Sequence, residues 1–460
     1  MSARYSSAAL IILAAIFLAG VVWPAAQKST HGFASYYTAS RLLVEEGLDA
    51  RIYDDSWFRV QTEAATNGAA SDIFNANPPT MALLALRVAG LPHETARAVA
   101  TGLNAIGLCG ALVLIGYTLR LRSGVLLSGV ALGLLGAPTI AQFQLGQAYV
   151  VVLLLYIIVW LGLRSGSHWL VGMGLAFAMV LKLAGAPLWL FVLVLGRWRA
   201  LAWAVGISLA IFALSMPFIS LDSWRTFLFE ALPRAVQSPT VASTAYQSLP
   251  GFWAQLLRGD PVFNPAPIVD WPFGAALFTT LDVLAIVGVT LFFARRLPID
   301  IGFAAATVAS VAIVPFAEQH QYIVMILPAM IVLARLQLVI LPSSRRQVLA
   351  RTPVRDKGAW ASEARNLFSD ADIEDSSGTL FPLNDMTSVW LLLIAAAFLM
   401  VPLPYQSPQL ANGWLALLAY PRLYGALSLW GLLVFQNEIR ISRTIAHPDT
   451  PQAIHQKSGY

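Results

Sequence analysis

The side chains that could do chemistry in this chain gather between His31 and Pro79, in a long polar stretch of an otherwise apolar sequence. A carboxylate here could take the proton from an attacking hydroxyl group, and aromatic rings could stack on sugar faces. The carboxylates are Glu45, Glu46, Asp49, Asp54, Asp55, Glu63 and Asp72, and the aromatic residues include Tyr36, Tyr37, Tyr53, Trp57 and Phe58. These side chains favour a protein that acts on a substrate at the membrane surface over one that only conducts a solute through the membrane.

Further polar groups interrupt the apolar sequence at Gln144 and Gln147, at Lys182, at Tyr246, and at Glu318 with His320. A lysine can hold a phosphate as a leaving group. Each group also has a structural interpretation. The amides would hydrogen-bond backbone at a helical hairpin, Lys182 would snorkel to the membrane interface, and His320 would be an ordinary loop histidine.

The elements that must position these residues are membrane helices. Hydrophobic residues make up 58% of the 460 residues and charged residues 12%, whereas soluble domains carry about 25% charged residues. The mean hydropathy is +0.68. The single cysteine, Cys109, excludes an intrachain disulfide and is expected to be buried. The net charge of +5 belongs to basic loops, and no nucleic-acid partner is expected.

Twelve apolar runs have spanning or near-spanning length: 8–26, 94–118, 124–139, 148–163, 168–183, 185–196, 200–219, 273–294, 299–315, 321–337, 388–403 and 413–435. Several are shorter than the ~20 residues of a straight span and are expected to be buried by neighbouring helices. The first run could be a cleaved signal peptide, but its length favours an uncleaved span. The short segment 79–91 is predicted to be an interfacial or re-entrant helix.

The distribution of Lys and Arg predicts the orientation. The basic pairs at 197–199 and 295–296 indicate that their loops lie in the cytoplasm. With this orientation both termini are also predicted to be cytoplasmic. The predicted divisions are a membrane core at 1–341 with outer loops at 27–93 and 220–272, a disordered cytoplasmic loop at 342–387, and C-terminal transmembrane helices with a cytoplasmic tail at 388–460. All the polar groups above then fall on the outer side, and we expect them to share one cavity.

A cation, amides, a histidine and carboxylates in one cavity suit an anionic, hydroxyl-rich substrate such as a lipid-linked sugar phosphate. A carboxylate would act as base, and the lysine would hold the phosphate. The candidate substrate-binding residues are Tyr36, Tyr37, Asn77, Gln144, Gln147, Lys182, Tyr246 and His320.

Several short motifs occur in a recognisable order over roughly residues 8–340. They are Gly32 to Ser40, Gly47, Ile52-Tyr53-Asp54, Phe74, Asn77-Pro78-Pro79, Leu145-Gly146-Gln147, Gly172-Met173-Gly174, Lys182, Pro187 and Arg197-Trp198-Arg199. In this order the chain resembles integral-membrane glycosyltransferases of the GT-C class. The particular resemblance is to glycosyltransferase family 87, which is of the polyprenol-phosphate-mannose-dependent mannosyltransferase type.

The resemblance implies an all-α polytopic membrane protein, a GT-C-like bundle of about 10–12 transmembrane helices, with interfacial helices in the first outer loop. It also implies a periplasmic active face in the inner membrane of the cell envelope and a polyprenyl-phosphate-linked sugar donor. The acceptor would be a lipid or a glycan, with membrane lipids as further partners. No cofactor or metal is expected.

In that family an acidic residue early in the first outer loop acts as the general base, and its position aligns with Gly32 here. The candidate replacements are His31, Asp54 or Asp55, and Glu318. A remaining alternative is a catalytically inactive member that binds lipid or protein.

One other hypothesis about function and the role of one further residue stay open. A transporter or flippase would show internal repeats, and none is evident between the two halves of the chain. The intramembrane carboxylate Asp282 is either functional or a partner in a hydrogen bond between helices.

Overall fold

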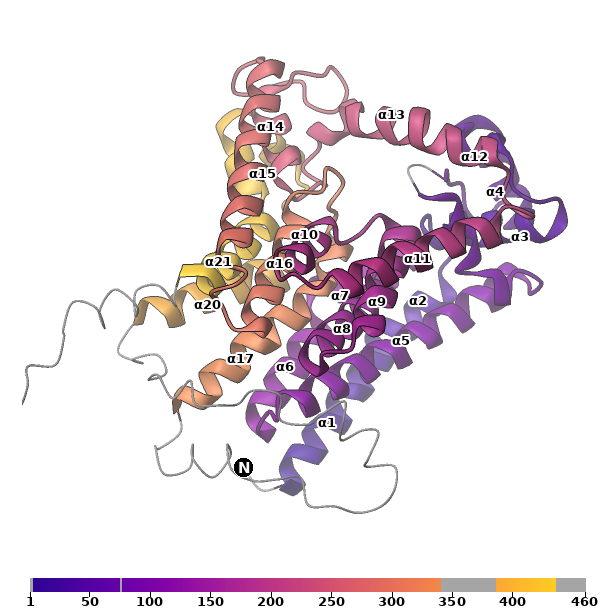
Figure 1. Cartoon of the computed structure of the whole chain (residues 1–460). Helices are drawn as coiled ribbons and strands as arrows, with labels where there is room; N and C mark the ends of the chain where they lie inside the picture. The colour runs from indigo at the N-terminus through magenta and orange to yellow at the C-terminus, as the bar shows by residue number, and fades with distance from the viewer. Residues whose placement is uncertain (1–2, 75–76, 341–385, 436–460) are drawn as a thin grey trace, which may run out of the picture.

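The computed structural model describes residues 3–74, 77–340 and 386–435 as a bundle of helices (Figure 1). Within these residues there is no β-strand, and the only bridges join Leu48 to Ile219 and Asp260 to Asn264. Several helices have the length and apolar composition of membrane spans. The predicted all-α polytopic membrane fold is therefore confirmed. The predicted loop 342–387 lies almost wholly outside the described residues, as does the tail beyond 435.

Six stretches of the described chain are long and apolar enough to cross a membrane: Ser7–Gln27, His93–Thr118, Ser123–Leu145, Trp198–Ser215, Pro272–Phe293 and Gln319–Gln337. The corresponding helices are α1 (Ala3–Phe17) with α2 (Trp23–Gln27), α5 (His93–Thr118), α6 (Ser123–Leu135) with α7 (Ala137–Leu145), α11 (Trp198–Ser215), α15 (Pro272–Phe293) and α17 (Ile326–Ile340). A further pair, Gly413–Ala419 with α21 (Pro421–Phe435), is bent by 56°.

The other apolar runs form shorter helices: α8 (Tyr149–Ser165), α9 (His168–Lys182), α10 (Ala186–Val194), α16 (Ile299–Ala312) and α20 (Met386–Met400). Two of them lie at the centre of the bundle. Leu153, Ile157 and Trp160 of α8 are fully buried, as are Phe303 and Ala304 of α16. Burial by neighbouring helices explains their short apolar runs, as expected from the sequence.

Glycines set the position of α9 between α8 and α11. A Cβ on Gly172 would lie 2.8 Å from the carbonyl oxygen of Ala200 in α11, and a Cβ on Gly174 would lie 2.8 Å from that of Leu155 in α8. Small residues allow membrane helices to approach closely. The Gly-Met-Gly motif therefore packs α9 between two neighbours and fixes the end of the helix, where Lys182 lies.

The helices of the two loops predicted to be outer, 27–93 and 220–272, gather at one end of the molecule, and these segments keep the name outer loops below. They are α3 (Phe33–Glu45), α4 (Asp55–Ala65), α12 (Leu221–Thr226), α13 (Leu232–Gln237) and α14 (Leu249–Leu257). Figure 1 shows them along the top and the upper right, while the start of α1 and the end of α17 lie toward the bottom. The segment predicted as an interfacial helix forms two 3-10 turns, Pro79–Leu83 and Leu86–Val88.

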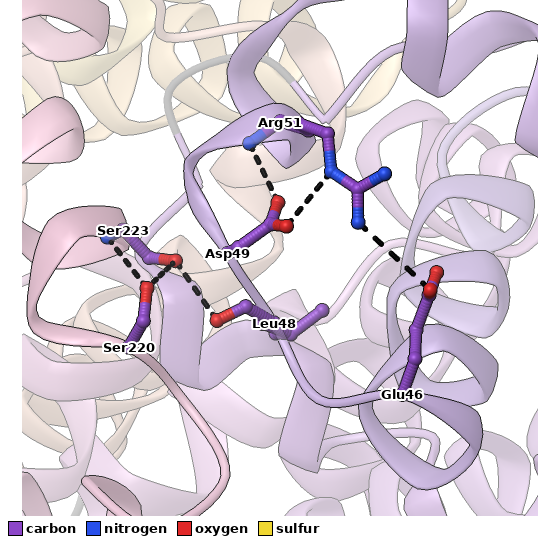
Figure 2. Close-up of polar contacts among 6 residues, drawn as sticks. All are labelled: Glu46, Leu48, Asp49, Arg51, Ser220 and Ser223. Carbon is purple, nitrogen blue, oxygen red and sulfur yellow. Dashed lines mark hydrogen bonds and ion pairs between the residues drawn. The ribbon is translucent and has the colours of Figure 1, made fainter.

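The two outer loops are joined directly at Leu48 (Figure 2). The backbone N–H of Leu48 donates to Phe218, and its carbonyl accepts from the backbone N–H of Ser220 at 2.8 Å. The Ser223 hydroxyl also donates to this carbonyl at 3.1 Å. On the solvent side, the Arg51 guanidinium lies 2.8 Å from Asp49 and 3.8 Å from Glu46.

The C-terminal helices pack on the rest of the bundle through a buried arginine. Arg422 of α21 is fully buried. Its guanidinium donates to the carbonyl of Phe398 at 2.5 Å and to the side-chain oxygen of Gln319 at 3.1 Å. The segment 388–435 therefore reaches the region before α17, close to Glu318 and His320.

The structure tests the predictions for two residues of the apolar runs, Asp282 and Cys109. Asp282 of α15 accepts a hydrogen bond from the indole of Trp253 in α14 at 2.7 Å, which favours the helix–helix interpretation. The prediction that Cys109 is buried was wrong, because this residue is exposed on α5. It lies near Ile106 and Val113, which are also exposed. An apolar run does not distinguish a lipid-facing surface from a core.

Candidate active site

Lys182 is the centre of the candidate site. It is the last residue of α9, and the next residue, Leu183, ends the helix with a left-handed backbone at φ +49°. The ammonium group donates to the Tyr36 hydroxyl at 2.7 Å, to the side-chain oxygen of Asn77 at 2.9 Å and to that of Gln147 at 3.4 Å. The Tyr36 hydroxyl in turn donates to Gln147. Four predicted binding residues thus form one cluster from distant parts of the chain.

The Gly146-Gln147 turn is positioned by Arg97. Gly146 ends α7 with φ +64°, and a Cβ at this position would overlap the guanidinium of Arg97. The buried Arg97 donates to the carbonyls of Phe143 at 2.6 Å and Gln144 at 3.1 Å, which are free at the helix end. Glycine is needed here so that Arg97 can hold this helix end and direct Gln147 toward Lys182.

Asp72 brings a carboxylate to the start of α3. One of its oxygens accepts from the backbone N–H of Gly32 at 2.5 Å, and the other from that of Ile73 at 2.9 Å. Burial raises the pKa of Asp72, although these two hydrogen bonds and the nearby His31 act in the opposite direction. Asp72 was not among the selected candidate bases, although it was visible as a loop carboxylate.

Position 32 itself has no room for an acidic side chain. Gly32 adopts φ +96°, and a Cβ there would lie 2.7 Å from the amide nitrogen of Gln147 and from the carbonyl of Leu145. Asp72 therefore supplies the carboxylate beside this position, 40 residues later in the chain.

Glu318 and His320 lie on another side of the cluster. A carboxylate oxygen of Glu318 is 3.5 Å from the Nδ1 atom of His320, whose buried ring packs edge-on against Tyr149 at 5.2 Å. Burial acts to raise the pKa of Glu318, but His320, His31 and Lys182 together outweigh it and leave this pKa below its ordinary value. The Glu318 charge also acts on Tyr246.

Three other predicted site residues, Asp54, Asp55 and Tyr37, take no part in the described contacts of the Lys182 cluster. Asp54 and Asp55 are exposed, and Asp54 caps α4 by accepting from the backbone N–H groups of Ser56 and Trp57. The Tyr37 hydroxyl donates to the carbonyl of Leu91 at 2.7 Å.

Gln144 and His31 are exposed. The described contacts of Gln144 run through its backbone carbonyl, which also accepts from Thr30. His31 lies near enough to Asp72 and Glu318 for its charge to act on both carboxylates. Within the described residues, no group of three or more His, Cys, Asp or Glu side chains could hold a metal ion.

Sequence reasoning missed two residues that build this site, Asp72 and Arg97. Asp72 lies between Ala69-Ala70-Ser71 and Ile73-Phe74, and a lone carboxylate in an apolar surrounding is a signal of burial. Arg97 lies near the start of an apolar run and gave no comparable signal, because its partners are backbone carbonyls.

The helical fold and the buried polar cluster around Lys182 define a polytopic helical membrane protein with a candidate polar site. The model of glycosyltransferase family 87 matches residues 75–315, which is just over half of the chain. The chain belongs to this family and is a membrane glycosyltransferase. No curated protein and no solved structure matched the chain. The matched region includes Gln147 and Lys182 and excludes Asp72 and Glu318.

Proposed function

We propose that the protein transfers a mannose-like sugar from a polyprenyl-phosphate donor to a hydroxyl group of a lipid or glycan acceptor. The observation that carries this proposal is the ammonium group of Lys182, whose hydrogen bonds in the described structure all go to neutral oxygens. The charges of Glu318 and Asp72 reach Lys182, but its described hydrogen bonds include neither carboxylate, and a desolvated cation is costly unless an anion pairs with it directly. A donor phosphate would provide that anion.

The chemistry balances without another reactant. The acceptor oxygen forms a bond to the anomeric carbon, and the bond from that carbon to the phosphate oxygen breaks. The electron pair leaves with the lipid phosphate, where Lys182 stabilises the developing negative charge. The hydroxyl proton moves to a carboxylate of the site.

The neutral partners of Lys182 would orient the donor. Tyr36, Asn77 and Gln147 hold the ammonium in place. Because the phosphate oxygens can replace some of these contacts, binding would exchange neutral acceptors for a charged one, which gives stronger hydrogen bonds. Tyr246 and His320 would face the sugar or the acceptor.

The test is sugar transfer by the purified full-length protein in detergent, with synthetic polyprenyl-phosphate mannose and other polyprenyl-phosphate sugars as donors. We expect transfer to an extracted lipid or glycan acceptor. Lys182→Met should lower kcat/KM by about 10²–10³-fold. Lys28→Met, at an exposed lysine, is the matched control and should leave the rate unchanged.

The competing hypotheses give different results. An inactive binding protein would be silent with every donor, in the wild type as in the variant. A flippase would move the labelled donor across proteoliposomes without releasing sugar to an acceptor. Either result, obtained with protein that melts cooperatively, contradicts the proposed transfer.

We also propose that the site faces the periplasm. In a Cys109→Ser background, Lys28→Cys should react with a membrane-impermeant maleimide in intact spheroplasts. Arg199→Cys, in a predicted cytoplasmic loop, should react only after permeabilisation. The reverse labelling pattern would place the site on the cytoplasmic side.

A further inference from the structure

Two carboxylates from different parts of the chain act on the same lysine. Asp72 comes from the first outer loop, after α4, and Glu318 from the segment before α17. The charges of both act on Lys182 and also on the hydroxyl of Tyr36. A transfer reaction needs one proton acceptor, so the two carboxylates must have different roles.

Their hydrogen-bond partners differ. Each oxygen of Asp72 accepts from one backbone N–H group, of Gly32 or Ile73. The Ser35 hydroxyl is a further hydrogen-bonding neighbour of this carboxylate. A carboxylate offers about four lone-pair positions, so these three groups leave one position for the hydroxyl group of an acceptor. The contact of Glu318 is with the imidazole of His320 at 3.5 Å, a group that can itself carry a positive charge.

We propose that Asp72 is the catalytic base of the transfer, and that Glu318 is a positioning residue that keeps a permanent negative charge beside His320 and Lys182. This inference rests on the proposed function. The acceptor hydroxyl would donate its proton to a free lone pair of Asp72 as its oxygen bonds to the anomeric carbon. The leaving electron pair would go to the phosphate held by Lys182.

The electrostatic environment agrees with this division. Burial raises the pKa of Asp72, which makes it a better proton acceptor near neutral pH. The pKa of Glu318 is lowered by its positive neighbours, which makes it a poorer one. Carboxylates whose environments move their pKa values apart commonly divide the roles in this way. The charged or titratable groups facing Asp72 are His31, Tyr36 and Lys182.

The sequence-selected alternatives fit the role less well. Asp54 is exposed and both of its backbone contacts are made by one oxygen at the start of α4. Asp55 and His31 are also exposed. The partly buried position of Asp72 suits a catalytic base better, because the surrounding protein keeps water away from the reacting hydroxyl.

The experiment compares Asp72→Asn with wild type in the full-length protein, using polyprenyl-phosphate mannose as donor. The amide keeps an oxygen acceptor for Gly32 and loses the ability to take a proton. We expect kcat to fall by about 10²–10⁴-fold with an unchanged dissociation constant for the donor. The matched control is Asp260→Asn, because Asp260 also accepts from two backbone N–H groups, those of Val262 and Phe263.

The pH profile separates a base from a structural carboxylate. The fall of wild-type kcat toward acid should be absent from the residual activity of Asp72→Asn and retained in Glu318→Gln. An active Asp72→Asn beside an active wild type would overturn the role of Asp72 and leave the proposed function intact. Loss of donor binding in Asp72→Asn would also overturn it. A wild type that is silent with every donor would instead contradict the proposed function itself.

Discussion

The polar stretch from His31 to Pro79 in the first outer loop carries tyrosines and carboxylates both near its ends and in its middle, but in opposite surroundings. At the ends, Tyr36, Asp72 and Asn77 lie against the membrane helices beside Lys182. In the middle, the Arg51 ion pairs have side chains that are about half exposed (Figure 2). Exposed ion pairs contribute about 0–1 kcal/mol, whereas burial displaces the pKa of Asp72. A surplus of carboxylates in the sequence therefore does not identify a base, because only the structure separates the buried carboxylate of Asp72 from the exposed ones in the middle of the loop.

The largest effect is expected from placing an acid at position 32. Gly32→Asp would put a Cβ 2.7 Å from the carbonyl of Leu145 at a backbone φ of +96°. The expected loss of stability is about 2–3 kcal/mol, and the displaced Gln147 and Lys182 should abolish transfer. Thermal melting in detergent and the transfer assay measure the two effects.

The control for this variant is Gly68→Asp. Gly68 lies in the same loop with φ +77°, and no atom lies within 4 Å of its ideal Cβ position. The cost there should be confined to backbone strain of about 1 kcal/mol. Equal effects of the two variants would show that the ends of the loop are no more constrained than its remainder.

A second prediction concerns pH. The raised pKa of Asp72 means that its ionised form is disfavoured by folding. As the pH falls through this raised pKa, activity should fall because the base is protonated, while the Asp72 contribution to stability should rise. Rate and melting temperature between about pH 4, near the ordinary carboxyl value, and pH 7 measure this.

Glu318 should behave in the opposite way. Its lowered pKa gives a contribution to stability that is present above the ordinary carboxyl pKa and is lost as the pH falls through the folded value. Asp72→Asn should remove the first dependence and leave the second. If Asp72→Asn keeps both pH dependences, the proposed difference in role between Asp72 and Glu318 is contradicted.

A smaller effect is expected where the outer loops meet. Ser223→Ala removes the hydroxyl that donates to the carbonyl of Leu48 at 3.1 Å and contacts Ser220 at 3.0 Å. The loss should be about 1 kcal/mol, seen as a lower denaturation midpoint, with kcat unchanged because the Lys182 cluster lies elsewhere. Ser128→Ala, at an exposed helix position, is the control.

The smallest effect is expected in the middle of the loop. Asp49→Asn weakens the pair with Arg51, whose side chain is 55% exposed. Stability should change by less than about 1 kcal/mol, and added salt should reduce the difference further. A loss of transfer as large as that of Asp72→Asn would remove the distinction between the two parts of the loop.

Much of the site was accessible from the sequence. The order of Asn77-Pro78, Gly146-Gln147 and Lys182 indicated the family, and these residues do meet in the structure. The sequence could not decide between the loop carboxylates. Asp54 and Asp55 stood out in sequence because they are adjacent, although Asp54 serves as a helix cap.

The sequence by itself determined the apolar helices and the membrane class, because hydropathy acts locally along the chain. The residues of the lysine cluster were indicated by the polar interruptions of the apolar runs and by the order of the family motifs. Only the tertiary structure decided that Asp72 contacts Gly32, that Arg97 holds the Gly146 turn, and that Cys109 faces outward. Burial and side-chain direction depend on which helices become neighbours, and that arrangement is set by packing across the whole bundle.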